Sequence, residues 1–215
     1  MRGVIDTMDS LITGPTLEPL DLEEVKKQRR FAATSLDTLF DLWIAAARQH
    51  FEEYTGRQMI SAVWEYWLDG FPDDAEIEIP HPPLQAILSV KYDDGAGEEQ
   101  TLDADSYRVI APQGPYGARG RVAVAIGSTW PTTAAHAKAV RIQYRAGFGD
   151  TPADVPELVQ YALMLLVGHF HKFGEEVQDA KNALVSLPLG AKLVMDGWKY
   201  SALPVLPPRS STWLV

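Results

Sequence analysis

The spacing of apolar residues changes twice along this chain. From Ser35 to Gly56 apolar positions recur every three or four residues, which predicts a long amphipathic helix that ends where Gly56 takes a left-handed conformation. From Ile60 to Asp69 the repeat is two, as in a β-strand. Helical spacing returns in residues 156–173, where most sides are apolar. The chain is therefore expected to place strands between helices.

Shorter elements complete this outline. Asp21 and Glu24 form a capping-box pattern, which predicts a first helix that ends near Phe31. Asp154 is expected to cap the later apolar helix, because a proline and a glutamate follow it in the first turn. Short alternating runs predict further strands at residues 76–79, 87–92, 100–102, 107–110, 121–126 and 140–144.

Together these elements predict an α+β protein. We expect a helical body, made of the long amphipathic helix and the apolar C-terminal helix, with an inserted small antiparallel β domain and extended termini. A chain of 215 residues is long enough for this arrangement. We expect an N-terminal arm at residues 1–19 and the first part of the helical body at 20–59. The β insert is expected at 60–150, the second part of the body at 151–200 and the C-terminal docking tail at 201–215.

Composition excludes several kinds of chemistry. The chain has no cysteine, which excludes disulfides, thiolate metal sites and a cysteine nucleophile. Its formal charge of −10 does not favour wrapping of DNA, although an acidic wall would let DNA pass without adhering. The N-terminal region has acidic residues within its apolar stretch, and the apolar run at 163–168 is too short for a bilayer. Neither a signal peptide nor a membrane segment is expected.

Few residues are arranged for catalysis or metal binding. His169 and His171 are two positions apart on a predicted helix and point to different faces, unlike zinc ligands. The acidic stretch 93–99 does not have the spacing of an EF-hand and is expected to be a solvated hairpin tip. We therefore predict no catalytic, cofactor-binding or metal-binding residues.

Arg119 and Arg121 lie in a glycine-rich connection. A phosphate-binding loop needs a following helix, but residues 122–126 alternate like a strand. We expect a flexible β connection whose two arginines could contact a partner or a phosphate backbone.

Three long segments occur in a fixed order and cover roughly residues 35–175. They are IAAARQHFEEYTGRQMI, WEYWLDGFPDDAEIEIPHPPLQAILSVKYDDGAGEEQTLDADSYRVI and AVRIQYRAGFGDTPADVPELVQYALMLLVGHFHKF. This ordered set resembles the head–tail connector (adaptor) proteins of tailed bacteriophages and related gene-transfer particles. The resemblance implies a structural protein without catalysis or cofactor. It would lie at the head–tail interface of the virion, after assembly in the host cytoplasm.

The same resemblance implies a set of partners. Such proteins form a ring, commonly of twelve copies, under the portal protein of the capsid. The far side of the ring receives a head-closure (stopper) or tail-completion protein. Double-stranded DNA passes through the central channel without sequence recognition, and no membrane takes part.

Residue roles follow as expectations. In the family the C-terminal segment reaches into the portal, so the docking residues are expected to be Leu203, Val205, Leu206, Arg209, Trp213, Leu214 and Val215. A ring subunit needs two different faces. The expected subunit-interface residues are Trp43, Phe51, Trp67, Leu165 and Phe170. The expected channel or DNA-proximal residues are Asp37, Asp41, Arg119 and Arg121.

Two other interpretations remain open at this point. One is a small hydrolase that uses carboxylates of the β insert, which would need two acids that converge across a cleft. The other is a carbohydrate-binding β module that uses Trp64, Trp67 and Trp130 as stacking surfaces.

Overall fold

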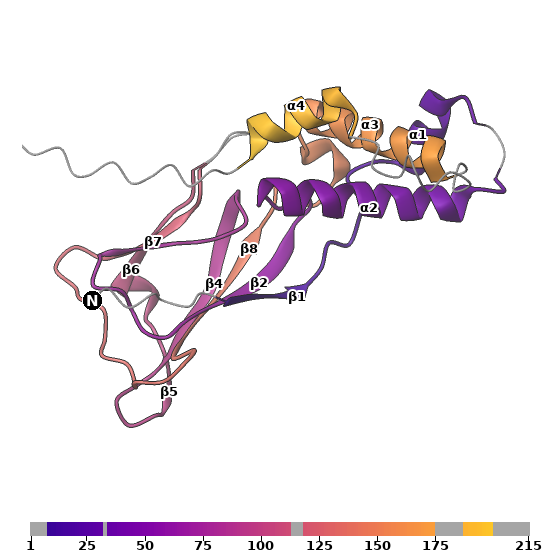
Figure 1. Cartoon of the computed structure of the whole chain (residues 1–215). Helices are drawn as coiled ribbons and strands as arrows, with labels where there is room; N and C mark the ends of the chain where they lie inside the picture. The colour runs from indigo at the N-terminus through magenta and orange to yellow at the C-terminus, as the bar shows by residue number, and fades with distance from the viewer. Residues whose placement is uncertain (1–7, 32–33, 113–117, 175–186, 200–215) are drawn as a thin grey trace, which may run out of the picture.

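The computed structural model describes residues 8–31, 34–112, 118–174 and 187–199. Its helices lie together as one layer, and two antiparallel sheets extend away from that layer (Figure 1). Each part has a hydrophobic core of its own.

Within the described ranges, four helices form the helical layer: α1 (Leu22–Arg29), α2 (Asp37–Thr55), α3 (Glu157–Gly174) and α4 (Leu189–Trp198). Helices α2 and α3 are thus present where helical spacing predicted them. Asp21 caps α1 by accepting a hydrogen bond from the Glu24 backbone N–H, as its sequence pattern predicted. The helices share one core of apolar side chains, which includes Val25, Phe40, Ile44, Phe51, Val159, Leu163, Leu166, Met195 and Trp198.

The larger sheet has five strands in the order β1-β2-β8-β4-β5. These strands are β1 (Met8–Thr13), β2 (Ala62–Leu68), β8 (Val140–Ala146), β4 (Leu84–Asp93) and β5 (Glu99–Thr101). All neighbouring pairs are antiparallel. Strands β1 and β5 are therefore the edges of this sheet.

The smaller sheet has three strands in the order β3-β7-β6. They are β3 (Glu76–Glu78), β7 (Arg121–Val124) and β6 (Tyr107–Ile110). Apolar side chains fill the space between the two sheets, because alternate residues of each strand point to the same side. This core includes Leu68, Ile77, Ile79, Leu84, Val90, Val122, Val140, Ile142 and Tyr144.

Strand β1 overturns the predicted fold class. It lies within the expected N-terminal arm, yet it pairs with β2 across the sheet. The β structure therefore includes residues that precede α1 and α2. In the described part of the chain it has eight strands in two sheets, whereas the helices have only 8 to 19 residues each. The expectation of a helical body, built on a long amphipathic helix and carrying one small β insert, is wrong. The physical reason is that β2 needs a hydrogen-bonding neighbour on its outer side.

A buried polar network joins α2 to the larger sheet. Glu52, near the end of α2, accepts hydrogen bonds from Arg48 Nη1 (2.7 Å), Gln58 Nε2 (2.8 Å) and the Met59 backbone N–H (3.0 Å). Gln58 Oε1 in turn accepts a hydrogen bond from Trp64 Nε1 of β2 (3.0 Å). Burial raises the pKa of Glu52, although Arg48 opposes this effect. The network fixes the direction in which the chain leaves the helix.

The chain also crosses itself closely where the helical layer meets the sheet. The Phe148 N–H donates to the Met59 carbonyl (2.8 Å), which holds the end of β8 against the start of β2. Between them Gly147 has a φ of +129°, and a Cβ atom there would lie 2.8 Å from backbone atoms of Ile60 and Ser61. Only glycine fits this crossing.

Asp93 and Arg141 tie three strands of the larger sheet together. Arg141 Nη1 and Nη2 bind the two carboxylate oxygens of Asp93 at 3.0 and 2.5 Å, and Nη2 also contacts Glu99 Oε2 at 2.9 Å. The hydrogen bonds from Arg141 lower the pKa of Asp93 below its ordinary 3.8, against the opposing effect of burial. The charged carboxylate is therefore the form that the fold stabilises.

We predict that Gly147→Ala lowers the free energy of unfolding by roughly 2–4 kcal/mol, because it adds backbone strain and a clash. The matched control is Gly197→Ala in α4, where no atom lies within 4 Å of an added Cβ. That change should raise stability by about 0.5–1 kcal/mol, because alanine favours helix. Urea unfolding followed by circular dichroism measures both. Equal effects of the two substitutions would contradict the role of Gly147.

We predict that Asp93→Asn lowers stability at neutral pH and that this loss disappears in acid. The folded-state pKa of Asp93 is depressed, so its stabilisation is fully present above the unfolded value and is lost as pH falls through the folded value. The difference in unfolding free energy between the two proteins should therefore shrink below about pH 4. A constant difference from pH 7 to the lowest pH at which the protein remains folded would contradict this.

Candidate assembly surfaces

The expected docking tail lies outside the described residues. Leu203, Val205, Leu206, Arg209, Trp213, Leu214 and Val215 all belong to residues 200–215. Their role in docking therefore stays a prediction.

Most of the expected interface residues lie in or beside the helical core. Phe51 is fully buried, so its side chain is not on the surface of a single chain. Trp43 is half-buried and packs edge-on against Phe40 (5.2 Å between ring centres) and His171 (5.4 Å). Leu165 and Phe170 are also half-buried against this core.

Trp67 lies on the face of the larger sheet that points away from the smaller one, since neighbours along β2 alternate. Its Nε1 donates to Glu65 Oε1 (2.8 Å), and Lys138 Nζ lies 4.0 Å from the ring centre. Glu65 also accepts a hydrogen bond from Gln143 of β8 (3.0 Å). This outer face of the sheet is thus polar, with Trp67 half-buried among charged groups.

The two acidic positions of α2 have different surroundings. Asp37 forms an ion pair with Lys26 of α1 (2.7 Å), whose side chain is only 5% exposed. The hydrogen bond that Lys26 donates to Asp37 raises the pKa of Lys26. Asp37 therefore joins two helices, whereas the side chain of Asp41 is exposed.

Both arginines of the glycine-rich connection pair with β3. Arg121 Nη1 lies 2.7 Å from Glu76 Oε2, and Arg119 Nη1 lies 3.7 Å from Glu78 Oε2. These pairs connect β3 with β7 and the residues before it. The two arginines thus have acidic partners within the chain.

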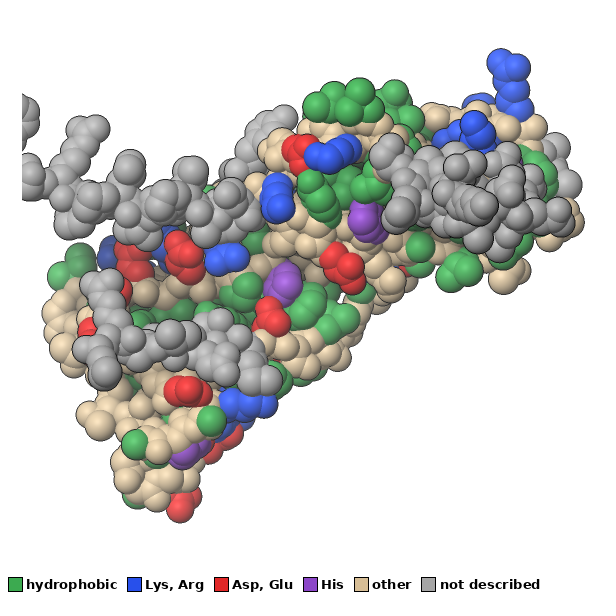
Figure 2. Space-filling view, viewed as in Figure 1, with side chains coloured by type: hydrophobic (Ala, Val, Ile, Leu, Met, Phe, Trp, Pro, Cys, Tyr) green, Lys and Arg blue, Asp and Glu red, His purple; other side chains and the backbone are tan. Residues whose placement is uncertain are grey.

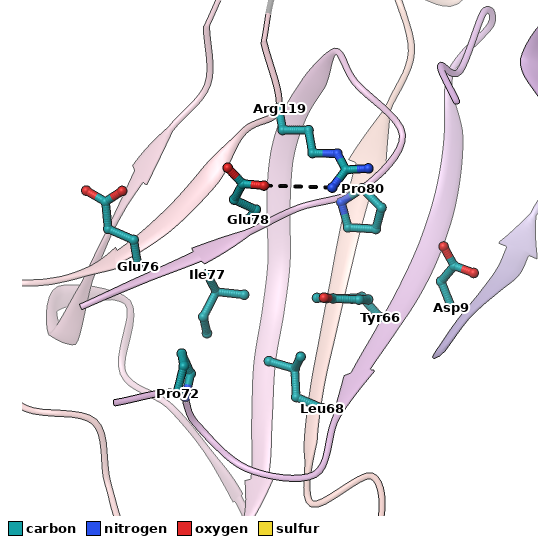
Figure 3. A pocket seen from close by; sticks show the side chains of 9 residues that line it. All are labelled: Asp9, Tyr66, Leu68, Pro72, Glu76, Ile77, Glu78, Pro80 and Arg119. Atoms are coloured by element: carbon teal, nitrogen blue, oxygen red, sulfur yellow. Dashed lines mark ion pairs between the residues drawn. The ribbon is translucent and has the colours of Figure 1, made fainter. Parts of the chain in front are cut away.

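A pocket of about 490 Å³ lies between β3 of the smaller sheet and β2 of the larger one, with Asp9 of β1 at its side (Figure 3). Its walls combine apolar side chains with charged groups: Asp9, Tyr66, Leu68, Pro72, Glu76, Ile77, Glu78, Pro80 and Arg119. Beside it, His81 Nε2 contacts Asp9 Oδ2 (2.7 Å), and the His81 ring stacks on Trp64 with 4.0 Å between centres. Burial lowers the pKa of His81 and favours its neutral form.

The buried Tyr144 hydroxyl belongs to the surroundings of this pocket. Burial raises its pKa, and so do the nearby Asp9 and Tyr66, both of which line the pocket. Within the described residues this hydroxyl has no hydrogen-bond partner.

The pocket is poorly arranged for acid–base catalysis. Glu76 and Glu78 each pair with an arginine, and Asp9 pairs with His81. The acidic side chains of the pocket are already engaged by partners within the chain, and no two of them converge as an acid–base pair. The pocket is thus better suited to binding a polar group than to proton transfer.

The three tryptophans of the carbohydrate-binding interpretation do not form one surface. Trp64 stacks on His81, and Trp67 is on the opposite face of the same strand. Trp130 stacks on Phe71 (4.9 Å between centres) and donates from Nε1 to the Asp74 carbonyl (3.1 Å). Each ring therefore already packs against a different group.

His169 and His171 are both half-buried on α3, and His171 stacks on Phe40. In the described part of the chain no group of three or more potential metal ligands is found. Among the described helices, none combines the length and apolar character that a membrane crossing requires.

Sequence analysis missed two exposed apolar patches of the helical layer. Leu39 and Leu42 of α2 are 43% and 60% exposed, and Leu189 and Leu193 of α4 are 72% and 63% exposed. Figure 2 shows hydrophobic side chains gathered at the top of the view, over α4, next to charged ones. The spacing of four between the α4 leucines was a usable signal, but no helix boundary was predicted there.

Solved structures share this fold. No family model matches the sequence, and no curated protein matches it. A chain from the neck of an empty gene transfer agent (GTA) particle, computed with C6 symmetry, aligns with a TM-score of 0.75, as does a chain from the virion of a native GTA particle. A chain from the neck of a native GTA particle, computed with C12 symmetry, aligns with a TM-score of 0.72. In each case the sequence identity is 20%, and the alignment covers 94% of this chain and all of the other. This chain therefore has the fold of a protein found in such particles.

Proposed function

We propose that this protein is a structural subunit of the neck of a phage-like particle. The proposal rests on the shared fold, which extends over 94% of this chain and the full length of chains from GTA necks. Its role would be mechanical: a ring of copies joins the capsid to the tail. No catalytic step is part of this proposal.

The finer proposal is a head–tail connector (adaptor) that binds the portal protein. The ring lies under the portal at the head–tail interface and receives a head-closure or tail-completion protein on its other side. Copies assemble in the host cytoplasm before they become part of the virion. A ring of twelve agrees with the twelvefold symmetry applied to one of the matching necks.

Net charge supports a passive channel. The chain carries 29 acidic and 19 basic residues, so a ring of copies is strongly negative. Repulsion between such a wall and DNA phosphates would keep the genome from adhering during ejection. Asp41 is a candidate for the channel wall, because its side chain is exposed.

The C-terminal segment is proposed to dock on the portal. Its composition supports this: it has three prolines together with Trp213, Leu214 and Val215, and a single charged side chain, Arg209. Proline limits the conformations of the free segment and lowers the entropic cost of ordering it on a partner.

We predict that deletion of residues 201–215 abolishes binding to the portal protein of the same particle. Thermal unfolding should stay unchanged, because the helices and the sheets each have a hydrophobic core built from residues between Leu20 and Trp198. Within the tail, Trp213→Ala should weaken binding at least about tenfold, as expected for a buried aromatic anchor. The matched control Ser210→Ala should have little effect.

Surface plasmon resonance with immobilised portal measures this binding. Full-strength binding by the truncated chain would refute the docking role of the tail. A complete lack of binding by the intact chain would refute the portal as its partner.

A further inference from the structure

Helix α3 is largely covered by its neighbours. Val159, Leu163 and Leu166 are fully buried, and the helix packs on both α2 and α4. Leu165 packs so closely on α4 that a Cβ at Gly190 would lie 3.1 Å from its Cδ1 atom. Helix α3 exposes one leucine, Leu158 (47%), whereas α2 and α4 expose two each, so the covering helices offer the larger leucine surfaces.

The outer faces of those covering helices carry the α2 patch (Leu39 and Leu42) and the α4 patch (Leu189 and Leu193). Leucines three or four positions apart on a helix form one continuous apolar surface. All four side chains are at least 43% exposed, which is unusual for leucines on both sides of a small helical layer. Each patch is a small apolar centre of the kind that interfaces bury.

The two patches face in opposite directions. On α2, Leu42 is separated by nearly half a turn from the buried Phe40 and Ile44. On α4, Leu193 is similarly opposite the buried Ala191 and Met195. Since the buried sides of both helices point toward the shared core, the two patches lie on opposite sides of the helical layer. In Figure 1 this layer has α2 below and α4 above.

Charges around the patches are complementary. Asp41 and Glu53 are exposed on α2, and among the described residues neither has an ion pair. Glu53 lies on the same side of α2 as Leu42 but about 16 Å further along the helix, so Asp41 is the acid beside the α2 patch. The α4 patch is flanked by Lys192 and Lys199.

The positive charge beside the α4 patch is only partly neutralised. Lys192 Nζ pairs with Asp196 Oδ2 (2.7 Å), and Lys199 Nζ lies 4.9 Å from the Tyr54 ring centre. Two lysines with one acid leave this end of α4 with a net positive charge, whereas Asp41 makes the surroundings of the α2 patch negative. Like patches would thus repel each other, and unlike patches would attract.

We infer that the α2 patch of one copy packs on the α4 patch of the next copy. This inference rests on the proposed ring. Repetition of one contact between two different faces produces a closed ring when the rotation between copies is suitable. Apolar leucines would form the centre of the contact, and the charged groups would set its direction.

The absence of cysteine in the native chain gives a clean test. Leu42→Cys and Leu193→Cys introduce one thiol each at exposed positions, and a short bismaleimide links thiols that come close together. The two variants are mixed at millimolar concentration and analysed by denaturing electrophoresis. Leu88→Cys on β4, which is 52% exposed, is the matched control.

We predict that the mixture of Leu42→Cys and Leu193→Cys gives at least about tenfold more linked dimer than either variant alone or than Leu42→Cys mixed with Leu88→Cys. The double variant L42C/L193C should give a ladder of higher oligomers. Equal yields in all mixtures, or strongest linkage of Leu42→Cys to itself, would overturn the inference.

A second measurement separates this inference from the proposed function. If the double variant forms rings on the portal by electron microscopy but gives no ladder, the assignment of faces is wrong and the connector role stands. If the ladder forms but portal binding is absent, the contact is right and the connector role is wrong. Circular dichroism of each variant confirms that it is folded.

Discussion

Helix α3 has to be enclosed, and the rest of the structure depends on this requirement. A helix that is apolar on most sides cannot remain in water, so other elements must cover it. Helix α2 covers one side and α4 another, while Arg29 of α1 reaches across to donate to the Met164 carbonyl (2.8 Å). The outer faces of α2 and α4 therefore form part of the protein surface. The surface chemistry of the protein is thus a consequence of how it buries one helix.

The connection between helices and sheets makes the outer surfaces one rigid unit. Glu52 and Gln58 join α2 to β2 through hydrogen bonds, and the crossing at Gly147 brings β8 to the same place. Buried polar groups that are fully paired resist rearrangement, since each broken hydrogen bond would leave an unsatisfied group. A subunit that transmits force between a capsid and a tail benefits from such a junction.

Helix positions were predictable because their apolar spacing repeats over several turns, as in Phe40, Ile44 and Phe51. Strand β1 was not predictable, since its Leu11 and Ile12 are adjacent and break the alternation expected of a strand. Its identity depends on pairing with β2, which is more than fifty residues away. Secondary structure that a distant neighbour imposes leaves little local signal.

The roles of individual side chains were harder to predict than the positions of helices and strands. The burial of Phe51 and the ion pairs of Arg119 and Arg121 depend on packing and strand register, which a single sequence does not determine. The α4 patch was missed for a related reason: which side of α4 is exposed depends on where α3 lies. Segment order nevertheless indicated a protein of phage-like particles, and chains from GTA necks share the fold of this chain.

The central claim is that copies of this chain form a ring on a portal. Electron microscopy of the purified chain mixed with the portal protein of the same particle tests it most directly. We predict a ring of density on one end of each portal, with the helical layers of adjacent copies in contact. Bare portals at saturating concentrations of the chain would contradict the account.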